Sequence, residues 1–133
     1  MMEIKKRRRG TAIVETPKGI LVTAVSGKTF ILPGGGAKKE EIETEAAIRE
    51  LKEETGLITN SATFIFRHIG EIQRSESGDL FQDHHTVCLI RTTGIPRPGN
   101  EVKRIGFYNS NSKIKISPTT KEIIDKYYNR EIK

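Results

Sequence analysis

Three glutamates close together in the sequence, Glu50, Glu53 and Glu54, form its clearest cluster of candidate metal ligands. On a helix, at about 100° per residue, the three positions fall within one arc of roughly 100°. Like charges at these spacings destabilise a helix by about 0.2–0.5 kcal/mol per pair. A solvated charged face is the alternative, but it would more often place lysines on the same arc. Carboxylate oxygens at this spacing suit a hard divalent cation, Mg²⁺ or Mn²⁺, which can clamp phosphate oxygens.

The segments around the glutamates predict how they are positioned. An apolar run at residues 29–32 is typical of a strand, which ends at Pro33 because proline has no backbone N–H. The glycines at 34–36 favour a backbone path with positive φ or close approach to a ligand; a plain strand-to-helix turn is the alternative. A helix is predicted from Ile42 to Thr55, and Gly56 follows at its C-cap.

Seven residues of this region fit one longer pattern, G-x5-E-x7-R-E-U-x-E-E-x-G-U, where U is apolar. The pattern runs from residue 35 to residue 57 and is similar at every position to the signature box of the Nudix hydrolases, a MutT-like family. The resemblance indicates the family strongly and the substrate weakly, because the box does not contact the outer parts of a substrate. The matched positions are Gly35, Glu41, Arg49, Glu50, Glu53, Glu54 and Gly56, with apolar Leu51 and Leu57.

The resemblance implies a metal site and a set of catalytic roles. Glu50, Glu53 and Glu54 would bind Mg²⁺ or Mn²⁺, together with the backbone carbonyl of Gly34. The general base stays open between Glu50, Glu53 and an acid further along the chain. Many relatives carry another acidic ligand before the last helix, and Glu101 is the nearest candidate here. Position 104, where an acid is often seen, is an arginine.

The other box residues would support the metal ligands. The resemblance implies that Arg49 orients the glutamates through ion pairs and does not touch the substrate. Glu41 would be an accessory acid. The remaining motif residues are glycines. Gly35 and Gly56 are fixed positions of the pattern, and Gly36 directly follows Gly35.

The composition predicts one soluble domain with a charge distribution suited to a polyanion. The chain has 133 residues and a net charge of +6. Between residues 38 and 54 there are seven acidic and four basic residues, so this segment is negative while the rest is strongly positive. No apolar run is long enough for a membrane span. The single cysteine, Cys88, lies in an apolar strand pattern and is predicted to be a buried thiol, which fits a reducing cytoplasm.

The basic run Lys5-Lys6-Arg7-Arg8-Arg9 is predicted to be a solvated arm or an edge that attracts phosphate. We therefore divide the chain into a basic N-terminal arm at residues 1–8 and a Nudix-type domain at residues 9–133. Nuclear import and nucleic-acid binding are alternatives, but the run contains no aromatic residue, so nucleic acid is disfavoured. No apolar segment of the secretory type follows the run, which argues against export.

The order of predicted elements indicates an α/β fold. Strands are predicted at 9–16, 20–25, 28–32, 62–73, 83–91 and 102–108, and a final helix begins after Ser117 or Thr119 and runs to about Ile132. Strands with two helices on a mixed β-sheet predict a single-domain α/β/α sandwich, which is also the fold that the resemblance implies. Because neighbours on a strand face opposite sides, His84 and His85 cannot both bind one metal.

The function predicted from the sequence is metal-dependent hydrolysis of a pyrophosphate bond in a nucleoside diphosphate-linked substrate. The default substrate is a (d)NTP, cleaved to a monophosphate and pyrophosphate. Arg9 and His85 are candidate substrate-binding residues. The alternatives are a hydrolase of ADP-ribose, nucleotide sugars or dinucleoside polyphosphates, and a non-catalytic module that binds nucleotide or RNA. A homodimer is also left open. Weak substrate patterns of relatives are missing, since Gln73, Arg74 and Thr120 stand at the positions concerned.

Overall fold

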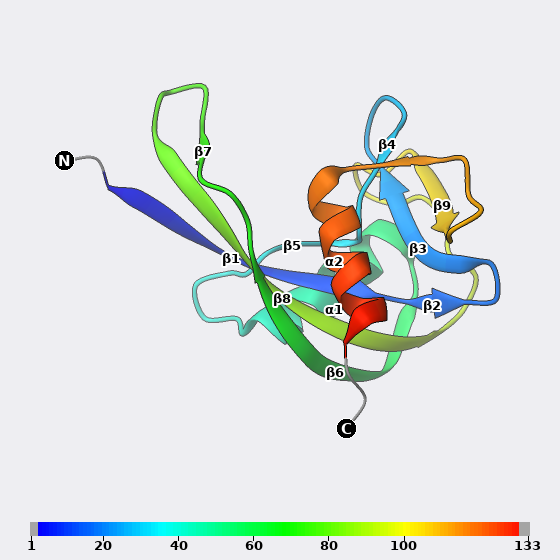
Figure 1. Ribbon diagram of the computed structural model, residues 1–133. Helices are drawn as coiled ribbons and strands as arrows, with labels where there is room; N and C mark the ends of the chain where they lie inside the picture. The colour runs from blue at the N-terminus through cyan, green and yellow to red at the C-terminus, as the bar shows by residue number, and fades with distance from the viewer. Residues whose placement is uncertain (1–2, 131–133) are drawn as a thin grey trace.

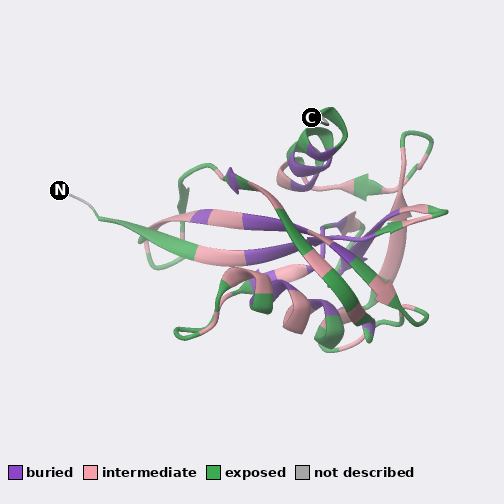
Figure 2. Cartoon of the chain, turned by 90° about the horizontal axis from the view of Figure 1, so that it is seen from below, coloured by how far each residue is buried: buried purple, intermediate pink, exposed green. Residues whose placement is uncertain are grey.

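A computed structural model describes residues 3–130, and in it a mixed β-sheet lies between two helices (Figures 1 and 2). This is the predicted α/β/α sandwich, built as a single domain. The elements along the chain are β1 (Ile4–Ile13), β2 (Glu15–Thr16), β3 (Gly19–Ala24), β4 (Thr29–Phe30), β5 (Gly34–Gly36), α1 (Glu43–Thr55), β6 (Ile58–Ile69), β7 (Gln73–Arg74), β8 (Leu80–Thr93), β9 (Arg104–Tyr108), β10 (Lys115–Ile116) and α2 (Pro118–Asn129).

The main sheet has the strand order β5–β1–β8–β6, with the short β7 paired to β8. Strands β1 and β8 run parallel in a continuous register from Ile4↔Leu80 to Ile13↔Leu89. The pairs β1–β5, β6–β8 and β7–β8 are antiparallel, which makes the sheet mixed. Two smaller sheets, β2–β3–β9 and β10–β4, complete the described part of the chain.

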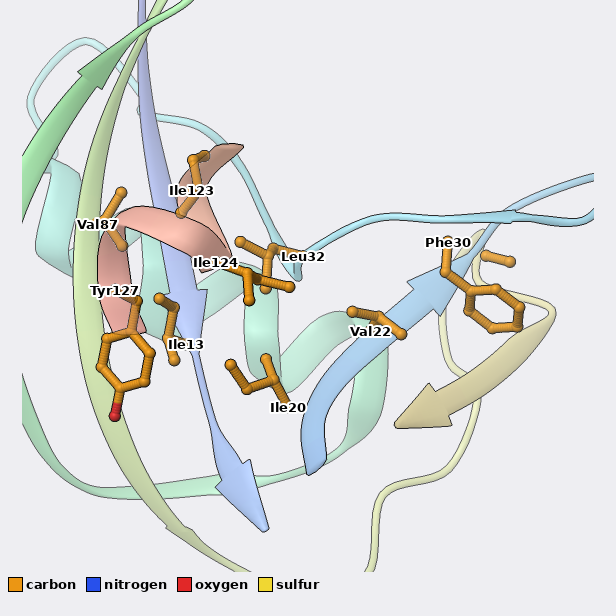
Figure 3. Packing of buried hydrophobic residues seen from close by; sticks show 10 residues of the cluster. Ile13, Ile20, Val22, Phe30, Leu32, Val87, Ile123, Ile124 and Tyr127 are labelled. Carbon is orange, nitrogen blue, oxygen red and sulfur yellow. The ribbon is translucent and has the colours of Figure 1, made fainter. Parts of the chain in front are cut away.

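The two faces of the main sheet bury separate hydrophobic clusters because successive strand residues point to opposite sides. On the α2 side, Ile13 and Val87 pack with Ile123 of the helix (Figure 3). On the α1 side, Ala12 and Cys88 pack with α1. Cys88 is fully buried, as predicted. Each helix is therefore held against its own face, and each face can carry a different site.

The helix boundaries follow from their caps. The backbone N–H of Gly56 donates to the Lys52 carbonyl at 2.8 Å, and Gly56 has the left-handed φ of 75° expected of a C-cap glycine. At the start of α2, the Ser117 hydroxyl accepts a hydrogen bond from the Thr120 N–H at 3.1 Å. Ser117, and not Thr119, is thus the N-cap. Helix α2 ends at Asn129, while the predicted end near Ile132 lies outside the described residues.

Two segments differ from the sequence prediction. The first strand begins at Ile4, not at Arg9, so residues 4–8 extend the sheet and do not form a separate arm. The physical reason is their pairing with β8, supported by side-chain ion pairs that sequence alone does not show. The glycine run, for which a positive-φ path and a plain turn were both left open, is the short strand β5, which pairs with residues 9–11 of β1.

Candidate active site

Two glycines allow helix α1 and strand β5 to come close enough to form a site. A Cβ at Gly10 of β1 would collide with the backbone of Glu43 and Ala47, so α1 crosses β1 in direct contact at this point. A Cβ at Gly35 of β5 would collide with the carboxylate of Glu50. The backbone of β5 therefore lies directly against the acidic face of α1, an approach that only a residue without a Cβ allows at Gly35.

Arg49 joins the acidic residues of the loop and the helix. Its Nε and Nη2 atoms donate to the two carboxylate oxygens of Glu41 at 2.8 and 2.9 Å. Its Nη1 donates to Glu50 Oε1 at 2.6 Å and reaches Glu53 at 3.3 Å, and its Nη2 also donates to the Gly36 carbonyl at 3.1 Å. The hydrogen bonds from Arg49 lower the pKa of Glu41 to about 2 and keep it ionised. The structure thus shows the ion pairing that the sequence led us to expect of Arg49.

Glu54 and Glu50 bring two carboxylates together beneath β5. Glu54 Oε1 accepts a hydrogen bond from the Gly34 N–H at 3.1 Å. Burial raises the pKa of Glu54 to about 8, and the nearby charge of Glu50 adds to the effect, although the Gly34 hydrogen bond opposes it. Two half-buried carboxyl groups that disfavour each other's charge, next to the backbone of β5, are a set of hard oxygen donors whose charge a divalent cation would neutralise.

In this structure the three predicted ligands are close but not yet arranged around one point. Among residues 3–130, no three Asp, Glu, His or Cys side chains form a group that could hold a metal ion as placed. The Glu50 carboxylate is drawn toward Arg49, and the Glu53 side chain is 41% exposed and only weakly paired. The donor chemistry fits Mg²⁺ or Mn²⁺, provided that the exposed Glu53 side chain turns toward Glu50 and Glu54.

Glu101 is the one candidate ligand that the structure does not join to this cluster. It is exposed in the turn before β9, and no hydrogen bond or ion pair links it to the α1 glutamates within the described chain. The neighbouring loop does reach α1, because the Gly99 N–H donates to the Glu54 carbonyl at 2.9 Å. A ligand role for Glu101 stays a prediction without a contact to support it.

A pocket of about 200 Å³ opens beside the acidic cluster, between α2 and the sheet. Its wall includes both predicted substrate-binding residues, Arg9 and His85, together with Gly34 of β5. Arg9 has no hydrogen-bonded or ionic partner among residues 3–130, so its guanidinium is free for an anion or a carbonyl. Burial, together with the nearby charge of Arg9, lowers the pKa of His85 to about 4, so the ring is neutral at pH 7. His85 Nδ1 lies 2.8 Å from the Thr11 hydroxyl.

The same pocket contains polar residues that the sequence analysis did not name as substrate-binding candidates. Arg7 donates to both oxygens of Asp83, at 2.6 and 3.0 Å. Burial alone would raise the pKa of Asp83, but the Arg7 hydrogen bond and the charge of Arg9 outweigh it and the pKa falls. Thr120 of α2 also lines the pocket. Alternation along β1 could have placed Arg7, Arg9 and Thr11 on one face, but only if the strand had been extended to Ile4.

The remaining histidines have separate positions. His84 lies on the α1 face, opposite to His85, as the strand alternation predicted. His68 of β6 is buried against α2, where Lys126 Nζ lies 2.9 Å from its Nδ1. Its Nε2 lies 3.2 Å from a Glu122 oxygen without a well-directed hydrogen bond. His68 therefore connects β6 to α2 and does not line the pocket.

Comparison with known proteins decides the family. The family model for the NUDIX domain matches residues 5–126. The chain belongs to the Nudix family. A putative Nudix hydrolase family member from Chromobacterium violaceum is 33% identical, with a TM-score of 0.77 over 98% of this chain and 84% of that one. No curated protein matches the sequence.

More distant solved structures share the fold. A MutT NUDIX hydrolase from Burkholderia pseudomallei is 21% identical, with a TM-score of 0.71 over 91% of this chain and 97% of that one. The ORF135 protein of E. coli is 18% identical, with a TM-score of 0.71 over 98% and 96% of the two chains. The Nudix fold of this chain is thus shown, and family membership supports pyrophosphate-bond hydrolysis with a divalent metal. Neither helix within residues 3–130 is long and apolar enough to cross a membrane.

Proposed function

We propose that this Nudix protein hydrolyses a ribo- or deoxyribonucleoside triphosphate to a monophosphate and pyrophosphate. The observation that supports this most directly is the position of Gly34. It lines the pocket, and its N–H donates to Glu54 at 3.1 Å. A nucleoside in the pocket would therefore direct its phosphate chain over the acidic face of α1. Arg9, which has no partner within the described residues, lies at the same wall and supplies positive charge.

The size of the pocket favours a substrate with one nucleoside. Sites for drug-sized ligands typically measure about 300–1,000 Å³. This pocket, at about 200 Å³, is smaller, so it suits one nucleobase and leaves the phosphates outside over the acidic cluster. A dinucleoside polyphosphate would need a second pocket at its far end. ADP-ribose and nucleotide sugars remain alternatives, because their second half could extend into solvent.

The chain's own residues divide the chemical work. Glu50, Glu53 and Glu54, with the Gly34 carbonyl, would hold Mg²⁺ or Mn²⁺, which when bound acts as a Lewis acid on the phosphates. Arg49 fixes Glu41 and Glu50 through its ion pairs. A water oxygen attacks one phosphorus, the bond to the departing pyrophosphate breaks, and a carboxylate accepts the water's proton. Glu53 is the best placed acceptor, since it is the most exposed of the three and the most weakly paired.

The test is product analysis over a panel of ribo- and deoxyribonucleoside triphosphates, ADP-ribose, nucleotide sugars and dinucleoside polyphosphates, each with Mg²⁺ and with chelator. We expect triphosphates to give monophosphate and pyrophosphate only when metal is present. Base selectivity should be modest, because no base-reading pattern is evident in the sequence. Preference for ADP-ribose or a dinucleoside would overturn the triphosphate proposal but not the family chemistry. Tight nucleotide binding without turnover would favour a binding module instead.

A further inference from the structure

The α1 face of the main sheet carries a second basic pocket, on the side opposite to the active-site pocket. Its volume is about 310 Å³. It lies beside the first turn of α1, since Glu43 lines it. The N-terminal part of β1 extends beyond that helix (Figure 2). The lining side chains come from three adjacent strands and the start of α1, and they include Lys6, Arg8, Glu43, Arg67, His84 and Thr86.

Strand register brings the cationic residues of this pocket together. Arg8 lies opposite His84 across β1 and β8, and Arg67 lies opposite Thr86 across β6 and β8. Arg8 is already bound to Glu43, its Nε donating to the carboxylate at 2.7 Å. Lys6 and Arg67 are both exposed and form no ion pair within residues 3–130. Two uncompensated cations thus border the pocket, with no role in the proposed reaction.

An exposed aromatic ring continues the same face. Phe64 pairs with Cys88 of β8, whose side chain faces α1, so Phe64 also lies on the α1 side. Its side chain is 51% exposed, and the Arg67 guanidinium lies 5.8 Å from the ring centre. A half-exposed phenylalanine beside an unpaired arginine offers a stacking surface with positive charge next to it.

The length of this face points to a chain-like ligand. Lys6 lies opposite Gln82 and Phe64 lies opposite Cys88, so the two ends are six residues apart along β8. At about 3.3 Å per residue, this is roughly 20 Å. A single phosphate or mononucleotide would contact only part of it. Successive phosphates and bases of one strand would contact the cations and the ring together.

We propose that the α1 face binds single-stranded nucleic acid, with Lys6 and Arg67 on phosphates and Phe64 stacked on a base. The basic run alone lacks an aromatic residue, but the fold supplies one from β6. The net charge of +6 favours the encounter with any polyanion, and the pocket and ring define where one strand is held. The proposal does not depend on the identity of the hydrolysed substrate.

Fluorescence anisotropy with labelled twelve-nucleotide oligouridine and oligodeoxythymidine tests this directly, at several salt concentrations. Each phosphate contact contributes about 0.7 to the slope of log affinity against log salt for a single strand. K6A/R67A should weaken binding at least tenfold and reduce the slope by about 1.4. F64L should weaken binding several-fold without changing the slope, because stacking carries no charge. The two oligonucleotides distinguish RNA from DNA.

The matched control removes two lysines elsewhere. Lys113 and Lys115 are exposed near β10, outside the main sheet, so K113A/K115A changes the net charge equally. We expect its affinity to stay within about twofold of the wild type. An equal loss in this control would mean that only net charge matters and would overturn the site. An unchanged affinity in F64L, confirmed as folded by its melting curve, would overturn the stacking role and with it the preference for nucleic acid. The rate of nucleoside triphosphate hydrolysis is measured separately and should not change in any of these variants.

Discussion

The Arg49 guanidinium donates hydrogen bonds to both carboxylate oxygens of Glu41, eight positions earlier in the sequence, at 2.8 and 2.9 Å. The same guanidinium holds Glu50 at 2.6 Å. Only a planar, forked donor can make these contacts at once. The pair therefore fixes the loop before α1 relative to the helix that carries the acidic cluster, and it determines which way Glu50 points.

Replacing the Arg49 guanidinium with the single ammonium group of lysine should lower activity and metal binding while the protein stays folded. We expect R49K to lower kcat by more than tenfold, because lysine cannot hold Glu41 and Glu50 together. Calorimetric titration with Mn²⁺ should show weaker metal binding, a change that a purely chemical role would not cause. K52R, at an exposed position of the same helix, is the control and should behave like the wild type. Unchanged Mn²⁺ affinity in R49K would contradict the positioning role.

The adjacent glycines of β5 give a sharper comparison. A Cβ at Gly35 would collide with the Glu50 carboxylate, whereas a Cβ at Gly36 would meet nothing within 4 Å. G35A should therefore displace Glu50 and reduce both Mn²⁺ affinity and turnover, by roughly tenfold or more. G36A should leave both nearly unchanged. Steady-state kinetics and metal titration on the two variants check this, and equal behaviour would show that the β5 backbone does not constrain Glu50.

Removing the half-buried carboxylate of Glu54 should lower activity without lowering stability. E54Q should lower kcat by 10²-fold or more, in line with losses of metal-site and electrostatic groups elsewhere. Its thermal midpoint in chelator should stay level or rise, because a desolvated acid with a pKa of about 8 has been removed. Added Mg²⁺ should raise the wild-type midpoint, since a ligand stabilises the state that binds it. The same addition should raise the E54Q midpoint much less. E40Q, changed at an exposed loop position, is the control.

The sequence specified the parts of the fold that depend on local pattern. The box, the α1 boundaries and the buried Cys88 could all be predicted, because periodicity and caps are local signals. The start of strand β1 at Ile4 could not be predicted, since the run of five basic residues at 5–9 resembles a solvated segment. Its stability comes from a partner more than seventy positions away, through Arg7–Asp83 and the parallel register with β8.

The pocket was predictable only in part for the same reason. Arg9 and His85 were named from their charge and strand position. They line the same wall of the pocket because β1 pairs with β8, which places Arg9 opposite His85. Asp83 carries no local signature of a binding role, and Thr120 was noted only as a position where a weak substrate pattern of relatives is missing. The three glutamates proposed as metal ligands could be singled out as a set because one helix carries them all. Their detailed orientation was not predictable, because Arg49 and β5 determine it from outside that helix.

The Arg7–Asp83 pair makes a prediction about pH. The pKa of Asp83 is lower in the folded protein than its ordinary value. Asp83 therefore stabilises the fold at pH values above its unfolded pKa, and this contribution is lost as the pH falls through its folded pKa. Because the Arg7 side chain is 42% exposed, we take the pair to be worth about 1 kcal/mol, and D83N should then lower the thermal midpoint at pH 7 by roughly 4 °C. The gap between wild type and D83N should stay constant down to about pH 5 and narrow steadily below about pH 4. D125N removes a carboxylate from the exposed Lys121–Asp125 pair and should shift the midpoint little at any pH. A D83N gap as wide at pH 3 as at pH 7, measured by thermal melts in matched buffers, would show that the charge of Asp83 does not support the β1–β8 pairing.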